Sequence, residues 1–127
     1  MREDEMDNGG NGRGTALIEA RGVHKTYSDN GVPVEAVRGV DLTIRRGEFT
    51  SLVGPSGSGK TTLLNVMAGL DDPTEGEVEL AGTRISDMSG RELSELRRDR
   101  IGFIFQAYNL IPVLSAEENV EYIMLLQ

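Results

Sequence analysis

The sequence predicts an α/β fold in which an antiparallel β subdomain precedes a partial parallel sheet with helices. Extended stretches joined by short turns fill residues 17–53. A glycine-rich loop, GPSGSGKTT at 54–62, then separates an apolar stretch from a helical pattern. Further on, the continuous apolar run 101–105 is typical of a buried strand in a mostly parallel sheet. These three observations together indicate the fold class.

Composition narrows the possible classes of protein. The 127 residues suit one ordinary domain, with 38% hydrophobic and 27% charged residues. The net charge of −8 argues against a nucleic-acid-binding face, and the absence of Cys excludes disulfides and thiolate metal sites. No apolar run approaches the ~20 residues of a membrane span, and no secretory signal pattern is present. A cytoplasmic location fits these features.

The residues before the glycine-rich loop predict a tail followed by three extended segments. Residues 1–14, rich in Gly, Asn and charge, predict a disordered tail. Alternation from Leu17 to Tyr27 and an extended stretch from Val34 to Ile44 predict two strands, and a turn then leads into a third at 49–53. This long β region disfavours a small P-loop kinase, which begins almost directly with the phosphate-binding strand.

The loop at 54–62 has the spacing G-x-x-x-x-G-K-[ST] that holds phosphates. Gly57 and Gly59 permit positive φ and close approach of a ligand, so that backbone N–H groups converge at a helix N-terminus. The Lys60 ammonium can reach the β- and γ-phosphates, and the Thr61 hydroxyl can ligate Mg²⁺. The alternative is a Gly/Ser turn that merely connects a strand to a helix. We expect a nucleotide site made by Gly54, Ser56, Gly57, Ser58, Gly59, Lys60, Thr61 and Thr62.

Helical patterns follow the loop in three places. Apolar residues from Leu63 to Leu70 recur at helical spacing, with Gly69 near the end and Pro73 as a stop. After a short strand at 78–80, Ser89 and Glu92 have the spacing of a capping box that opens a second helix. Ser115 and Glu118 repeat that spacing before a third, which is still apolar where the sequence stops at Gln127. Because no cap follows, we expect the chain to be cut short.

Several polar residues admit two interpretations. Tyr27 could stack on an adenine ring or pack at a strand end, and the residues alone favour neither. Gln106, at the carboxyl end of the run 101–105, could contact a Mg²⁺-bound or attacking water, but a solvated loop residue is the commoner explanation. The single His24 and the arginines near the end of the second helix are best explained as solvated surface residues.

Together these segments resemble an ATP-binding cassette (ABC) transporter ATPase from about Ile18 to the end. The resemblance rests on VHKTY, VEAVRGVDLTIRRGEF, LVGPSGSGKTTLLNVMAGLDDPTEGEVELAG and LRRDRIGFIFQAYNLIPVLSAEENV. The LDDPTEG turn and the last stretch are most similar to the subgroup that pairs with lipoprotein-release and macrolide-export permeases. The family has Ser at the position of Thr61 in most members.

The resemblance assigns roles to individual residues. Tyr27 would stack on the adenine, and Gln106 would sense the γ-phosphate through Mg²⁺ and water. Lys60 and Gln106 would then be catalytic, and Thr61 and Gln106 would be near the metal. The loop 106–114 would meet a transmembrane permease subunit, and the full-length form would act as a homodimer or with a paired nucleotide-binding subunit. The implied cofactors are ATP and Mg²⁺, and the implied location is the cytoplasmic, inner face of the cell membrane.

The resemblance also implies an N-terminal portion of such an ATPase, which would end before the signature motif. The expected division is antiparallel β at 17–53, the P-loop at 54–62, core and Gln loop at 63–114, and the start of a helical subdomain at 115–127, all within a domain portion at 15–127. The signature, the strand-end acidic pair and the switch His of the family have no counterpart in these residues. We therefore expect a subunit that couples ATP hydrolysis to export in its complete form, and a fragment that binds nucleotide without hydrolysing it alone.

Two other functions stay open on the sequence. A soluble ABC ATPase without a permease has the same nucleotide-binding elements, although the 106–114 loop and the subgroup resemblance weigh against it. A non-catalytic nucleotide-binding fragment is the other alternative.

Overall fold

The computed structural model describes residues 14–107 and 109–126 and divides the chain into two units. The first unit runs from Met1 to Met88 and the second from Ser89 to Gln127, and each is described by itself. The predicted disordered tail at 1–14 lies outside the described residues, apart from the exposed Gly14.

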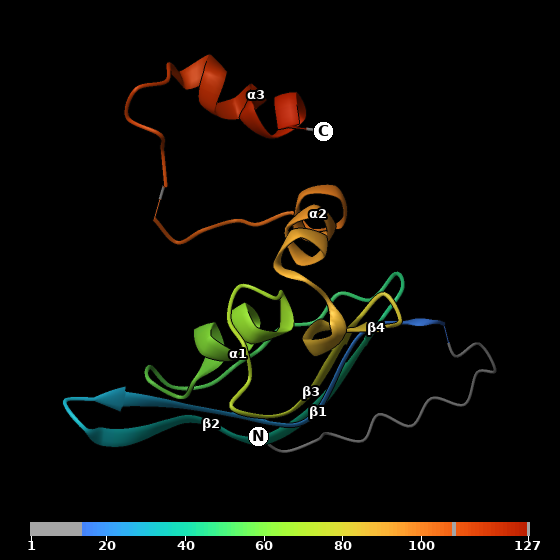
Figure 1. Ribbon diagram of the computed structural model, residues 1–127, viewed down its shortest axis with the longest axis vertical. Coiled ribbons are helices and arrows are strands. Elements are labelled where there is room, and N and C mark those ends of the chain that lie inside the picture. The colour runs from blue at the N-terminus through green and yellow to red at the C-terminus, as the bar shows by residue number, and fades with distance from the viewer. Residues whose placement is uncertain (1–13, 108, 127) are drawn as a thin grey trace. The chain divides into compact units, whose positions relative to one another are not determined.

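The first unit is built on a four-stranded antiparallel sheet with the strand order β2-β1-β3-β4 (Figure 1). Strands β1 (Ala16–Asp29) and β2 (Val32–Arg45) form a long hairpin. Its turn residues Asn30 and Gly31 both have positive φ, 50° and 81°, as a tight two-residue hairpin turn requires. Strand β3 (Glu75–Leu80) pairs with the other edge of β1, and the short β4 (Thr83–Arg84) pairs with β3. Of the three strands predicted before the loop, the first two are thus confirmed.

Helix α1 (Lys60–Met67) packs on one face of this sheet, beside β1, β2 and β3 (Figure 1). Its side chains Leu63, Val66 and Met67 are buried on the inward face, and the sheet contributes alternating apolar residues to the same core. The helix ends as predicted: Gly69 has a φ of 70°, and the Leu70 amide donates to the Asn65 carbonyl at 2.9 Å. The buried apolar residues of this unit are Ala20, Val23, Val37, Leu63, Val66, Met67, Val78, Leu80 and Ile85, the last in the short 3₁₀ helix η1 (Ile85–Asp87).

Two predicted strands are not strands in the structure. Residues 49–53 and 101–105 belong to no ladder; the Phe49 side chain is 98% exposed, and Ile104 is fully exposed. Phe103 and Phe105 stack on each other, with ring centroids 5.8 Å apart. An inner strand of a parallel sheet is stable only when neighbouring strands take its backbone hydrogen bonds and helices cover its faces. Within the described residues, neither segment has such neighbours.

The second unit contains the two helices that the capping patterns predicted. Helix α2 (Gly90–Arg100) begins at Ser89, whose hydroxyl accepts from the Glu92 amide while the Glu92 carboxylate accepts from the Ser89 amide. Ser115 and Glu118 make the same reciprocal pair at the start of α3 (Ala116–Leu126). Among the described residues, no helix is long and apolar enough to cross a membrane.

Candidate nucleotide-binding site

The loop before α1 has the backbone conformation that its glycines predict. Gly57 has a φ of 79° and Gly59 a φ of 93°, a region that residues with a Cβ rarely adopt. A Cβ on Gly59 would overlap the carbonyl oxygen of Ala36 in β2, whereas one on Gly57 would meet no atom within 4 Å. The loop therefore lies directly against the sheet at Gly59, and only glycine fits that contact.

The start of α1 leaves backbone donors available for an anion. Gly59 is the N-terminal cap residue and supplies no side chain to bind the first-turn amides. The Ser58 amide donates to the Pro55 carbonyl at 3.2 Å, which closes the loop into a turn just before the helix. A helix start with uncapped N–H groups and a partial positive charge is suited to phosphate oxygens. The loop thus fits a polyphosphate.

Lys60 brings the positive charge to this loop. Its ammonium donates to the carbonyls of Gly54 at 2.6 Å and Pro55 at 2.8 Å, and lies 3.4 Å from the Ser58 hydroxyl. These are contacts of the loop with itself, and an ammonium has three donors that it can redirect. The side chain is therefore already folded over the loop, where a phosphate would be bound.

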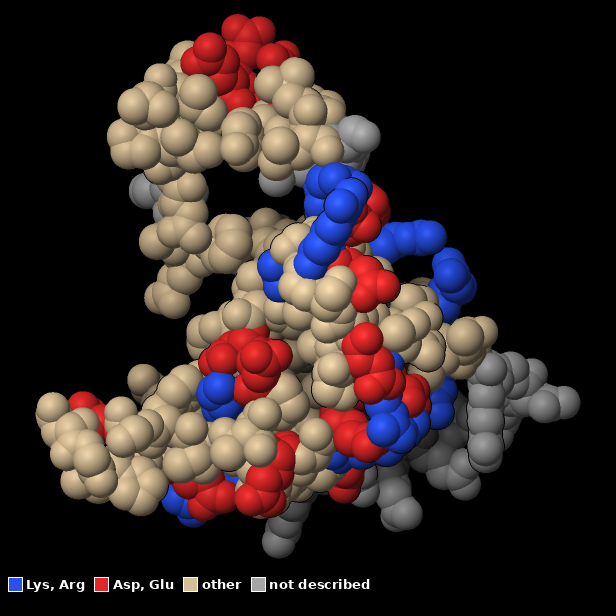
Figure 2. Space-filling model, viewed as in Figure 1, with Lys and Arg blue, Asp and Glu red and all other residues tan. Residues whose placement is uncertain are grey.

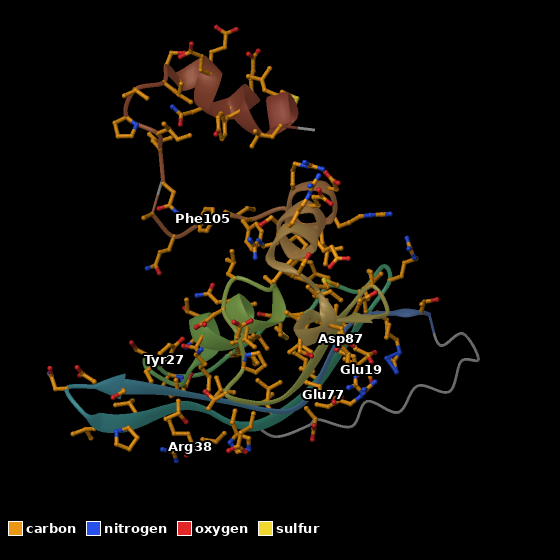
Figure 3. All side chains as sticks on the ribbon, in the orientation of Figure 1. Glu19, Tyr27, Arg38, Glu77, Asp87 and Phe105 are labelled. Atoms are coloured by element: carbon orange, nitrogen blue, oxygen red, sulfur yellow. The ribbon has the colours of Figure 1, made fainter. Side chains whose placement is uncertain are left out.

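An open cleft of about 450 Å³ borders the same loop. One wall is β2, from Glu35 to Val40, and the other comprises residues 52–55 with the loop and Leu63 of α1. Lys60 and Arg38 are the cations in its lining, and Glu35 is the acid. Figure 3 labels Arg38 beside the sheet. Glu35 is itself engaged, since its carboxylate lies 3.1 Å from His24 Nδ1 and 3.5 Å from Arg38 Nε.

Tyr27 lies next to the loop and helix rather than away from them. It sits near the end of β1 and its side chain is 41% exposed (Figure 3). Its hydroxyl donates to the Asp71 carboxylate at 2.8 Å and also bonds the side chain of Thr62, in the first turn of α1. Burial raises the pKa of Tyr27, helped by the bond to Asp71 and opposed by the bond to Thr62. The structure therefore joins Tyr27 to the predicted loop.

Thr61 and Gln106, the two residues predicted to lie near the metal, are both exposed in the structure. Thr61 is exposed on the first turn of α1, so its hydroxyl is accessible to a metal that bridges bound phosphates. Gln106 is exposed and belongs to the second unit, whereas the loop belongs to the first. In the described residues no cluster of three His, Cys, Asp or Glu side chains could hold a metal. Any metal here would thus depend on phosphate oxygens, as P-loop sites do.

Asp71 and Lys25 are the site residues that sequence reasoning missed. Lys25 Nζ lies 2.8 Å from Asp71 Oδ1, and the Lys25 bond is the largest cause of the lowered pKa of Asp71. Their separation of 46 positions hides this contact from any local pattern. The sequence signals that could have indicated them were Lys25, two residues before Tyr27, and Asp71, an acid in the turn after α1.

Comparison with known proteins places these features in one family. The family described as "ABC transporter" matches residues 37–125. The pyoverdine export ATP-binding/permease protein PvdT of Pseudomonas syringae pv. tomato is 51% identical over 108 residues, which cover 84% of this chain and 16% of PvdT. The ABC transporter ATP-binding protein MJ0796 of Methanocaldococcus jannaschii is 50% identical over 105 residues, covering 83% of this chain and 45% of MJ0796. This chain thus spans less than half the length of either relative.

Solved structures agree with this family assignment. A dimeric structure of the MJ0796 cassette in a post-hydrolysis state, bound to ADP and Pi, superposes with a TM-score of 0.82 at 46% identity, over 87% of this chain and 47% of that one. A second dimeric MJ0796 structure superposes with a TM-score of 0.83. The predicted fold class is confirmed: an antiparallel β subdomain followed by the helices and strands of an ABC cassette.

Proposed function

Because this chain belongs to the ABC transporter family, as an ATP-binding domain, we propose that residues 54–62 bind the phosphates of ATP for a transport ATPase. The observation that carries the proposal is the loop itself. Two glycines at positive φ, an uncapped helix start and an ammonium folded over the loop all meet within the nine residues 54–62. This combination favours a polyphosphate over any other anion, because it offers both a row of amides and a mobile cation.

Each residue has one task in this proposal. The amides of Gly57 to Thr62 hold phosphate oxygens, Lys60 neutralises the β/γ charge, and Tyr27 stacks on the adenine. Mg²⁺, when bound, would neutralise negative charge on the phosphates. The Thr61 hydroxyl is the protein ligand proposed for it, and Gln106 the residue that responds to the γ-phosphate. Gly54, Ser56 and Ser58 complete the loop around the phosphates.

The finer assignment follows the relatives. PvdT is named as an export protein in which ATP-binding and permease parts are combined. We therefore propose that this chain serves export or extraction, in the lipoprotein-release and macrolide-export type of cassette. It would act at the inner face of the cell membrane, with its loop 106–114 against a permease subunit. MJ0796 is dimeric in its solved structures, which supports a paired nucleotide-binding subunit here.

The 127 residues alone should bind ATP without hydrolysing it. Hydrolysis requires a strand-end acid to complete the Mg²⁺ site and a further group to orient the attacking water. In this sequence the run 101–105 leads into Gln106 rather than an acid. The structure leaves that run unpaired, so it does not supply the rigid edge on which such groups are held.

Titration of the chain with ATP and ADP tests the proposal. Lys60→Ala should weaken both nucleotides about tenfold or more, because it removes a charged hydrogen bond to the phosphates. Arg91→Ala is a suitable control, since Arg91 is an exposed cation paired with Glu95 on α2. Phosphate release from ATP should stay at background for the wild type, Lys60→Ala and Arg91→Ala. Equal nucleotide binding by wild type and Lys60→Ala would refute the phosphate site. ATP hydrolysis that depends on Lys60 would refute the prediction that the 127 residues do not hydrolyse ATP alone.

Co-expression with candidate membrane subunits tests the transport assignment. A chain whose loop 106–114 meets a permease should co-purify with that permease, and substitution of exposed apolar loop residues such as Leu110 and Val113 should prevent it. Retention of nucleotide binding in the same variants shows that the loop variants are folded. A chain that binds ATP but co-purifies with no membrane subunit would favour the soluble ABC ATPase instead.

A further inference from the structure

One carboxylate holds both the hydroxyl of Tyr27 and the ammonium of Lys25. Asp71 Oδ2 accepts from the Tyr27 hydroxyl at 2.8 Å, and Asp71 Oδ1 accepts from Lys25 Nζ at 2.8 Å. Asp71 lies just beyond the C-terminal end of α1, whereas Lys25 and Tyr27 lie on β1. Lys25, Tyr27 and Asp71 are called the Tyr27 clamp below.

The cation also touches the ring of the tyrosine. Lys25 Nζ lies 5.0 Å from the centroid of the Tyr27 ring, within the range of a cation–π contact. The same ammonium donates to the Asp72 carbonyl at 2.7 Å, and the Lys25 side chain is only 12% exposed. A lysine with this many fixed partners is held in one position. The ring is therefore restrained at two points, its hydroxyl and its contact with the cation.

The loop that carries Asp71 is attached to β1 without help from the carboxylate. The Thr74 amide donates to the His24 carbonyl at 2.8 Å, and the Thr26 amide donates to the Thr74 hydroxyl at 2.9 Å. The Asp71 amide donates to the Asn65 carbonyl of α1 at 3.3 Å. The Asp71 carboxylate also accepts from the Asp72 amide at 2.9 Å, within the same loop. Removal of the carboxylate should therefore leave the loop attached to β1 and α1, and it should free the ring, the lysine and the Asp72 amide.

We propose that Asp71, held by Lys25, positions the Tyr27 ring so that it is ready to stack on a purine base. This inference rests on the proposed nucleotide site. The ring's exposed part remains available to a base while its hydroxyl and the cation fix its orientation. A side chain held before binding loses less freedom when the ligand arrives, so affinity rises without a new contact to the ligand. Asp71 and Lys25 are positioning residues in this scheme.

The test compares two ligands that share phosphates but not the base. ATP and inorganic tripolyphosphate are titrated into the wild-type chain, Asp71→Ala and the control Asp72→Ala. Asp72 is a neighbouring acid that contributes its backbone amide and carbonyl to this network. Asp71→Ala should weaken ATP binding about three- to tenfold, the cost of ordering one side chain when the ligand arrives, and leave tripolyphosphate binding unchanged. Asp72→Ala should bind both ligands like wild type.

Tyr27→Phe distinguishes positioning from a general effect on folding. It keeps the ring and removes the hydroxyl that Asp71 holds, so it should weaken ATP binding about as much as Asp71→Ala does. The double variant Tyr27→Phe/Asp71→Ala should be no weaker than the more affected single variant, because both changes remove the same contact. ATP binding by Asp71→Ala at wild-type strength would overturn the proposal, as would an equal loss for ATP and tripolyphosphate. Wild-type chain that binds neither ligand would overturn the proposed function and, with it, this role of the clamp.

Discussion

At the scale of single residues, two glycines in one loop have different reasons to be glycine. Gly57 and Gly59 both adopt positive φ, but only at Gly59 would a Cβ overlap another part of the chain, the carbonyl of Ala36. The motif spacing predicted that both would be glycine for conformational reasons. Only the structure shows that β2 presses on the loop at Gly59. Backbone strain is common to both positions, and the steric contact is specific to one.

A pair of alanine variants separates these two causes. Gly57→Ala should lower the free energy of unfolding by about 1–2 kcal/mol, the cost of a left-handed residue with a Cβ. Gly59→Ala should cost more than that, because it adds the overlap with Ala36, and should also displace the loop and weaken ATP. Denaturant unfolding with ATP titration measures both effects. Equal costs for the two variants would show that the loop does not lie against β2 in solution.

At the scale of elements, the two capping boxes fix where α2 and α3 begin. In each box a carboxylate accepts from a serine amide, and this bond is the first cause of the lowered pKa of Glu92 and of Glu118. A carboxyl whose pKa is lower in the folded than in the unfolded state stabilises the fold above its unfolded pKa. That contribution disappears as the pH falls through the lower, folded pKa.

The helical signal should therefore fall in acid in a way that depends on these two glutamates. Both have an ordinary value of 4.5, so the loss should begin below that pH. The variant Glu92→Gln/Glu118→Gln keeps a side-chain acceptor that suits a capping box but does not titrate. Far-UV circular dichroism can follow the helical signal from about pH 6 to about pH 3, a range that includes the ordinary carboxyl pKa values. The helical signal should fall less for this variant than for wild type. Identical curves would mean that the boxes do not contribute to helix stability.

At the scale of the whole molecule, the first unit's sheet differs in charge and apolar surface from two unpaired segments, residues 49–53 of the first unit and residues 101–105 of the second. Acidic and basic side chains intermix on the sheet (Figure 2), where Arg21 pairs with Glu19, Glu77 and Glu79. By contrast, residues 49–53 and 101–105 expose aromatic and aliphatic side chains. Apolar side chains without cover are typical of surfaces that another part of a protein or a partner is meant to bury.

Hydrogen exchange should show this contrast directly. Amides in the middle of β1 are paired on both sides, by β2 and β3, and should be the slowest to exchange. Amides of residues 49–53 and 101–105 should exchange at close to the rate of an unstructured peptide, because neither segment belongs to a ladder. Mass spectrometry of the exchanged chain measures both. Protection of 101–105 as strong as that of β1 would show that the segment finds a strand partner in solution.

The sequence by itself determined those features whose cause lies within a few residues. The positive φ of Gly57 and Gly59, the Gly69 helix end, both capping boxes and the tight turn of the β1–β2 hairpin follow from local backbone chemistry. Residue spacing alone also predicted the phosphate-binding loop and, through resemblance, the family. Local rules suffice there because each donor finds its acceptor within one turn of the chain.

The tertiary structure decided everything that depends on distant partners. It pairs β3 with β1, although the sequence predicted only a short strand at this position, without a partner. It left 49–53 and 101–105 unpaired, because a strand needs neighbours that no apolar run can supply for itself. It brought Asp71 to Tyr27 across 44 positions, which no periodicity encodes. The physical reason is the same throughout: hydrogen bonds and burial between remote segments depend on how the chain packs, and packing is a property of the whole fold.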